Sequence, residues 1–197
     1  MDADHITVVS GLPRSGTSML MKMLEAGGLE PVVDGIRRAD ADNPGGYYEF
    51  EKVKKMGEDV SWLETAQGKV IKVISQLLED LPTQYRYKVL FAHREMAEIL
   101  ASQQVMLERR GQATDAVSDD EIDAIFQRHL DEMQTWLATQ DHLETLHVQY
   151  GGILADSQGE SKRIADFLGV PIDQQAMAEV VDANLYRQRK YRQERAK

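Results

Sequence analysis

The stretch ITVVSGLPRSGTSMLMKMLEAGG, residues 6–28, decides the fold. Its start, residues 6–10, is a continuous β-branched run, which predicts a buried parallel strand. Residues 17–26 then place leucine and methionine side chains at helical spacing, and the glycine pair at 27 and 28 predicts a left-handed helix end. The turn at residues 11–18 therefore connects a strand directly to the N-terminus of a helix.

This turn, GLPRSGTS, carries several groups that favour an anion. Its two glycines let backbone N–H groups curl inward, and the following helix adds the positive end of its dipole. Ser15, Thr17 and Ser18 add hydroxyl donors, and Arg14 adds a fixed positive charge. A plain strand-to-helix turn capped by Ser and Thr is the alternative interpretation. The equipment of the turn favours a phosphate-binding site.

The spacing of the turn is close to the nucleotide-kinase pattern GxxxxGK[ST], with Thr17 in place of the lysine. That lysine normally reaches the β- and γ-phosphates of ATP or GTP. A P-loop nucleotide-dependent kinase is therefore a second hypothesis, which the missing lysine disfavours. The absence of an acidic residue at the end of the predicted strand 88–92 also argues against it.

The rest of the chain alternates strands and helices, with a breaker-rich loop over residues 29–47. Further strands are predicted at 69–74, 88–92 and 146–149, and helices at 51–65, 95–110, 118–140 (opened by a Ser-Asp-Asp-Glu capping box), 161–168 and 173–183. This order predicts an α/β fold: three layers, α/β/α, around a mainly parallel central sheet, as one domain over residues 1–197. Ligands bind such sheets at the carboxyl ends of the strands, which here means the loops after residues 10, 74 and 92.

Residues 13–18, PRSGTS, resemble the 5′-phosphosulfate loop of the sulfotransferases that use 3′-phosphoadenosine-5′-phosphosulfate (PAPS), whose usual form is P-[KR]-[ST]-G-T-[ST]. The resemblance, to a small bacterial-type member, implies the P-loop-like sulfotransferase fold, with PAPS as donor and 3′-phosphoadenosine-5′-phosphate (PAP) as product. It also implies that Arg14, Ser15, Gly16, Thr17 and Ser18 hold the 5′-phosphate. Arg14 is then expected near the bridging oxygen of the transferred sulfate.

A second match involves Arg94, which follows the predicted strand 88–92, and Ser102, which lies eight residues later. In the sulfotransferase family an arginine and a serine in this arrangement grip the 3′-phosphate of the cofactor. An arginine fork and a hydroxyl two helical turns along can converge on one phosphate. Arg94 alone is equally consistent with a surface salt bridge, but its order after the first motif favours the phosphate role. A third similarity, around Tyr150 and the segment IADFLGVP at 164–171, supports the fold.

The strand at residues 69–74 is similar to the family strand that ends VKTH in cytosolic members. Lys72 matches the lysine near the transferred sulfate, so the resemblance implies a catalytic role for it. The histidine that serves as general base there corresponds to Ile74. This departure leaves the base to another group, or leaves the chain a non-catalytic nucleotide-binding protein.

Three side chains are candidates for the base. Glu49 lies in NPGGYYEFE, residues 43–51, which is similar to an NPxGYxE segment of bacterial relatives. A carboxylate beside Tyr and Phe rings is expected to be a stronger base. Glu51 is more simply explained as an acidic residue at a helix start. His93 points toward or away from the cofactor according to the pleat of its strand.

The charge is uneven: the chain carries −10 overall, whereas residues 187–197 hold six basic residues and one acidic. The acidic body disfavours nucleic acid as a partner. The basic tail, about 186–197, reads as a solvated end or as a lid over a polyanion. Its Arg189 and Lys190 match the start of the family's RKG loop over the 3′-phosphate, with Tyr191 in place of the glycine.

With no cysteine, the chain has no thiolate nucleophile and no disulfide. The histidines show no ligand spacing, so no metal is expected. Neither a secretory signal nor a membrane span is evident, which predicts a cytoplasmic protein. The predicted reaction moves a sulfuryl group from PAPS to a hydroxyl or amine of a small-molecule or carbohydrate acceptor.

Overall fold

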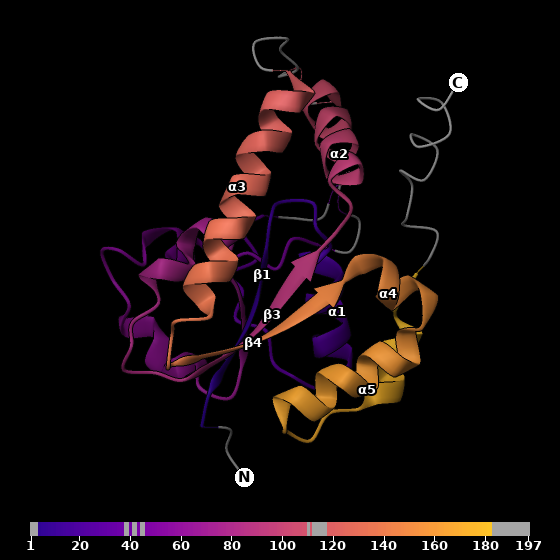
Figure 1. Cartoon of the computed structure of the whole chain (residues 1–197). Coiled ribbons are helices and arrows are strands. Elements are labelled where there is room, and N and C mark those ends of the chain that lie inside the picture. The colour runs from indigo at the N-terminus through magenta and orange to yellow at the C-terminus, as the bar shows by residue number, and fades with distance from the viewer. Residues whose placement is uncertain are drawn as a thin grey trace.

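A computed structural model describes residues 4–37, 40, 43, 46–109, 111 and 118–182 (Figure 1). The stretch that opens the sequence forms strand β1, Ile6–Gly11, and helix α1, Thr17–Ala26. Every residue of β1 is buried, as its continuous β-branched run predicts. At the end of α1, Gly27 stays right-handed and Gly28 takes the positive φ of 100°.

Four strands form one parallel sheet in the order β2-β1-β3-β4. β2 spans Val70–Lys72, β3 spans Tyr87–His93 and β4 spans Leu143–Gln149. Because Val9 pairs with Lys72 and Gly11 pairs with Ala92, the strands β1, β2 and β3 end at the same edge. The loops after these strands therefore meet, as expected for a binding site in a parallel sheet.

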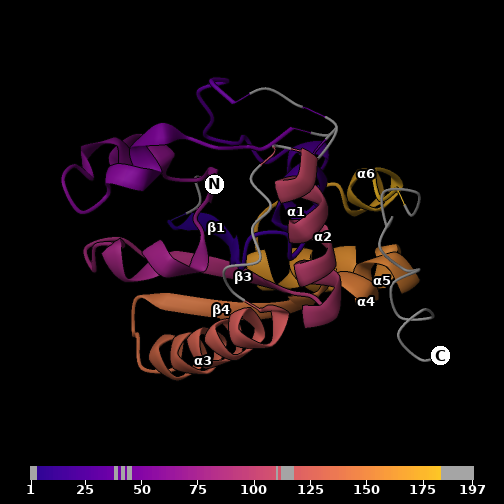
Figure 2. The same cartoon turned by 90° about the horizontal axis from the view of Figure 1, so that it is seen from above.

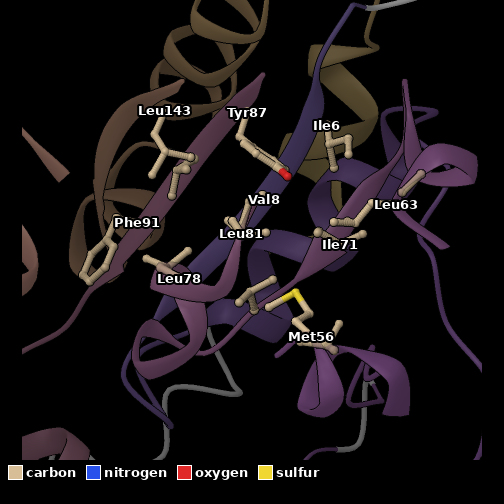
Figure 3. Close-up of a cluster of buried hydrophobic side chains, with 14 of the residues drawn as sticks. Ile6, Val8, Met56, Leu63, Ile71, Leu78, Leu81, Tyr87, Phe91 and Leu143 are labelled. Atoms are coloured by element: carbon tan, nitrogen blue, oxygen red, sulfur yellow. The ribbon is translucent and has the colours of Figure 1, made fainter. Parts of the chain in front are cut away.

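The two faces of the sheet are covered by different elements, which confirms the three-layer α/β/α fold (Figure 2). One face packs against α1, α4 (Tyr150–Ala155), α5 (Ser157–Leu168) and α6 (Gln174–Glu179). The other face packs against α3 (Asp119–Leu137) and three short 3-10 helices. Alternate residues of each strand enter the two cores. Val9 enters the core that contains α1, α4, α5 and α6, and Val8 enters the second core, which contains α3 and the 3-10 helices. Figure 3 shows this second core, in which Ile71, Leu78 and Phe91 lie together.

The helix predicted over residues 51–65 is wrong. The structure has two 3-10 helices instead, η1 at Glu51–Lys55 and η2 at Ser61–Ala66. Gly57 and the β-branched Val60 interrupt the helical run. The indole of Trp62 donates to the carbonyl of Asp59 at 3.2 Å and turns the chain back on itself. The segment buries its apolar side chains through i to i+3 turns, and not along one helical face.

Two helices rise beyond the carboxyl edge of the sheet (Figure 1). α2, Met96–Arg109, follows β3, and α3 opens with the predicted Ser118 and Glu121 capping box. The sequence did not predict η3 (Ser75–Asp80) or α4. β4 starts three residues before the predicted strand. Within the described residues α6 ends at 179, whereas the predicted helix runs to 183. Among the described helices, none is long and apolar enough to cross a membrane.

Candidate active site

The phosphate turn is shaped by backbone that only glycine adopts without strain. Gly11 and Gly16 have φ of 143° and 104°, and Arg14 has φ of 72°. A Cβ at Gly11 would lie 2.6 Å from the carbonyl oxygen of Ala92, and one at Gly16 would lie 2.4 Å from the ring of Tyr150. The turn therefore lies tightly between the end of β3 and Tyr150, the first residue of α4.

The hydroxyl of Ser15 is buried inside this turn and has no hydrogen-bond partner among the described residues. A buried hydroxyl without a partner costs free energy. Thr17 opens α1, so the first N–H groups of the helix belong to the turn. Together these groups suit a phosphate, and phosphate binding at this turn stays a prediction.

The two predicted phosphate anchors meet. The guanidinium Nε of Arg14 donates to Oγ of Ser102 at 2.9 Å, and Nη1 of Arg94 donates to the carbonyl of Arg14 at 3.2 Å. Arg94 also forms an ion pair with Glu98 at 2.9 Å and lies over the ring of Tyr150, with Cζ 4.5 Å from its centroid. Ion pair and ring together orient a nearly buried guanidinium.

Lys72, at the end of β2, extends to the other side of the turn. Its Nζ donates to Oγ of Ser18 at 3.0 Å and to the carbonyl of Tyr47 at 2.8 Å. Burial lowers the pKa of Lys72 to about 8; the charge of Glu49 acts in the opposite direction, and Arg14 adds to the lowering. A lysine whose pKa is lowered, with Arg37 and Arg14 adding to the lowering, favours a site that binds an anion.

Glu49 lies between two cations. Its Oε1 pairs with Arg37, and its Oε2 lies 3.6 Å from Nζ of Lys54. The guanidinium of Arg37 in turn stacks on the ring of Tyr47, 3.4 Å from the centroid. The sequence predicts Tyr and Phe rings near this carboxylate; the structure also places two cations beside it, Arg37 from the preceding loop and Lys54 from η1.

The other two candidates for the base lie elsewhere. Glu51 accepts from Nζ of Lys54 at 2.6 Å on the exposed surface. Nε2 of His93 lies 2.8 Å from Nδ1 of His147, on the neighbouring strand β4. Neither is among the described residues that line the cavity at the carboxyl edge of the sheet.

That cavity has a volume of about 610 Å³. Eight of the predicted site residues line it: Arg14, Gly16, Thr17, Ser18, Glu49, Lys72, Arg94 and Ser102. Ser15 is buried within the turn behind them. Arg189 and Lys190 lie outside the described residues. One cavity thus brings together the two predicted phosphate anchors, the half-buried Lys72 and one carboxylate.

The model of the sulfotransferase family matches residues 47–174, well over half of the chain. The chain belongs to the sulfotransferase family. The match includes Glu49, Lys72, Arg94 and Ser102, while the phosphate turn precedes it.

Solved structures of sulfotransferases share the fold. The sulfotransferase domain from the curacin biosynthetic pathway is 14% identical, with 92% of this chain and 80% of that chain covered and a TM-score of 0.53. A sulfotransferase from Mycobacterium tuberculosis is 18% identical, with 93% and 73% covered and a TM-score of 0.56. A mouse sulfotransferase complexed with PAP is 17% identical, with 91% and 64% covered and a TM-score of 0.55. No curated protein matches the sequence.

This sulfotransferase has site residues that the sequence analysis did not single out. Asn43 donates from Nδ2 to Oγ of Ser18 at 2.8 Å, and Arg37 pairs with Glu49. Tyr150, which the sequence links to the fold, also lies against both Gly16 and Arg94. The NPxGYxE segment begins at Asn43, so the sequence contains a signal for this residue. The pairing of Arg37 with Glu49 can be seen only in the tertiary structure. Among the described residues, no cluster of three or more His, Asp or Glu that could hold a metal is found.

A Gly16→Ala substitution tests whether the turn of this sulfotransferase requires glycine. Because the added Cβ meets the Tyr150 ring and φ is positive, we expect PAP to bind at least about 10-fold more weakly and stability to fall by about 1–3 kcal/mol. Calorimetry and thermal unfolding measure both. The matched control is Gly151→Ala in α4, where nothing lies within 4 Å. It is expected to retain PAP affinity; an equal loss in both variants would contradict the assignment.

Proposed function

We propose that the protein transfers a sulfuryl group from PAPS to a hydroxyl or amine of a small acceptor. The observation that carries this proposal is that the phosphate turn, the Arg94 and Ser102 anchor and the half-buried Lys72 all face one cavity. A nucleotide with a phosphate at each end of its ribose requires two separate anchors. Family membership and the missing loop lysine both disfavour the kinase hypothesis.

The residues of the turn, 14–18, would hold the 5′-phosphate through backbone N–H groups and hydroxyls. Arg94 and Ser102 would hold the 3′-phosphate. Arg14 contacts Ser102 at 2.9 Å, so its positive charge would attract both the 5′- and the 3′-phosphate of the donor. Lys72, beside Ser18, would neutralise charge on the sulfuryl group and on the leaving oxygen.

When bound, PAPS supplies the sulfuryl group: a bond forms between the acceptor oxygen or nitrogen and sulfur, and the bond from sulfur to the 5′-phosphate oxygen breaks. Glu49 takes the proton of the acceptor, and the phosphate oxygen leaves as part of PAP. Glu49 is the only one of the three candidate bases among the described cavity residues. Its pairing with Arg37 fixes the direction of the carboxylate.

Calorimetry with PAP and with ATP·Mg²⁺ tests the cofactor class. We expect PAP to bind and ATP·Mg²⁺ to bind much more weakly. Transfer of radiolabelled sulfate from PAPS to a panel of acceptors then tests catalysis. Tight PAP binding without transfer to any acceptor would favour a non-catalytic nucleotide-binding protein, and preference for ATP·Mg²⁺ would overturn the proposal.

An Arg94→Ala variant assigns the 3′-phosphate anchor. Loss of charged hydrogen bonds to a phosphate is expected to weaken PAP binding about 100-fold. Binding of adenosine 5′-monophosphate, which lacks the 3′-phosphate, should weaken less than about 3-fold, because this ligand does not use the anchor. The two ligands and the two proteins form a double-mutant cycle. The control is Arg128→Ala, an arginine of α3 that is exposed and outside the cavity. Equal losses for both nucleotides would place the 3′-phosphate elsewhere.

A further inference from the structure

The cavity continues beyond the phosphate anchors along one face of α2. Ser102, Val105, Met106 and Arg109 lie at helical spacing and all line it. Because a helix rises 1.5 Å per residue, the Val105 and Met106 level lies about 5 Å farther along the axis than Ser102. The wall therefore changes from polar at Ser102 to apolar at Val105 and Met106, and Arg109 follows one turn farther on.

Other elements add apolar side chains to the lining of this cavity. They include Phe126 of α3, Val53 of η1 and Leu77 of η3. Ile74 lines this cavity as well; it is 41% exposed and comes two residues after Lys72, the last residue of β2. An isoleucine exposed into a cavity beside the proposed site of transfer is suited to contact an apolar ligand.

The apolar wall is held in place by a hydrogen bond between two of its supporting elements. Nε2 of His129 in α3 lies 2.8 Å from Oγ of Ser75, the first residue of η3. His129 is one helical turn from Phe126, and Ser75 directly follows Ile74. The bond therefore ties the helix that carries Phe126 to the loop that carries Ile74, so the two apolar surfaces face the cavity before a ligand binds.

We propose that the acceptor is a hydroxyl compound with an apolar body, such as a phenol or a medium-chain alcohol, and not a free sugar. This inference rests on the proposed sulfuryl transfer. A sugar would lose water hydrogen bonds that aliphatic side chains do not replace. An apolar body gains by covering Ile74, Met106 and Phe126 while its hydroxyl points toward Lys72 and Glu49.

Binding to the protein saturated with PAP tests the acceptor class independently of turnover. The fluorescence of 2-naphthol is expected to report saturable binding, with competition by 1-decanol and none by methyl glucoside. Transfer of radiolabelled sulfate from PAPS should follow the same order. Competition by methyl glucoside at equal concentration, or preferred sulfation of the glucoside, would overturn the apolar acceptor. Lack of PAP binding in the same preparation would instead overturn the proposed function.

Paired variants on α3 locate the wall. Phe126→Ala is expected to weaken 2-naphthol binding about 10-fold, since it removes an apolar contact surface. PAP affinity should stay within about 2-fold. Ile125→Ala is the matched control, because Ile125 is the neighbouring side chain, 57% exposed, and is not among the described lining residues. Equal 2-naphthol affinity in the two variants would contradict the assignment of this wall.

Discussion

Replacing Glu49 with alanine is expected to lower kcat about 100- to 1,000-fold, because a positioned general base contributes on this scale. The carboxylate lines the cavity, and its charge acts on Lys72. PAP affinity should change less than about 3-fold, since Glu49 pairs with Arg37 and Lys54, which belong to neither predicted phosphate anchor. Initial rates at saturating PAPS, with calorimetry on the same preparation, separate the two effects.

Chemical rescue distinguishes a base from a structural ion pair. Formate fits the space of the deleted carboxylate and should restore a measurable fraction of the lost rate in the Glu49→Ala variant, in proportion to its concentration. The control is Glu51→Ala, since Glu51 contacts the same Lys54 but lies outside the described cavity lining. It should keep near-normal kcat. A Glu49 variant with normal kcat, or one that formate leaves unchanged, would point to a structural role through Arg37 and Lys54.

A Lys72→Met variant is expected to lose about 1,000-fold in kcat. Methionine keeps the length of the side chain but removes the charge, and preorganised charges at developing anions act on this scale. Removing this ammonium is not expected to unfold the protein, because burial already disfavours its charged form. Lys69→Met, which breaks only a surface ion pair with Glu30, is the control and should leave kcat unchanged.

The lowered pKa of Lys72 predicts a pH dependence. Since the ammonium is the charged form below its pKa and is lost above it, kcat/KM should fall as pH rises through about 8. Bound PAP carries negative charge that favours the ammonium, so binding at pH 8 should take up to about half a proton. Calorimetry in buffers of different ionisation enthalpy measures this uptake. It should vanish in Lys72→Met; uptake that persists there would assign the titration to another group.

The sequence predicted the elements whose signals are local. α1 begins and ends at the predicted residues, and the Ser118 capping box forms as expected. The predicted helix over 51–65 failed because its apolar residues pack individually against the sheet through 3-10 turns, a tertiary preference that overrides helical periodicity.

The candidate site was predicted in the same measure. Side chains placed at the ends of β1, β2 and β3 were found together, since parallel strands end at one edge. The pairing of Glu49 with a cation was not predicted, because Arg37 reaches it from another part of the loop. The pleat of β3 sets the direction of the His93 side chain. Its Nε2 lies against His147, and His93 is not among the described residues that line the cavity.

By itself, the stretch ITVVSGLPRSGTS determined a strand, a tight glycine turn and a helix start, because these follow from backbone sterics and hydrogen bonding within a few residues. The tertiary structure alone decided what surrounds that turn. The contact of Arg14 with Ser102, the burial of Lys72 and the apolar wall of α2 and α3 join residues distant in sequence. Such contacts depend on how helices pack at the sheet edge, and local periodicity does not encode them.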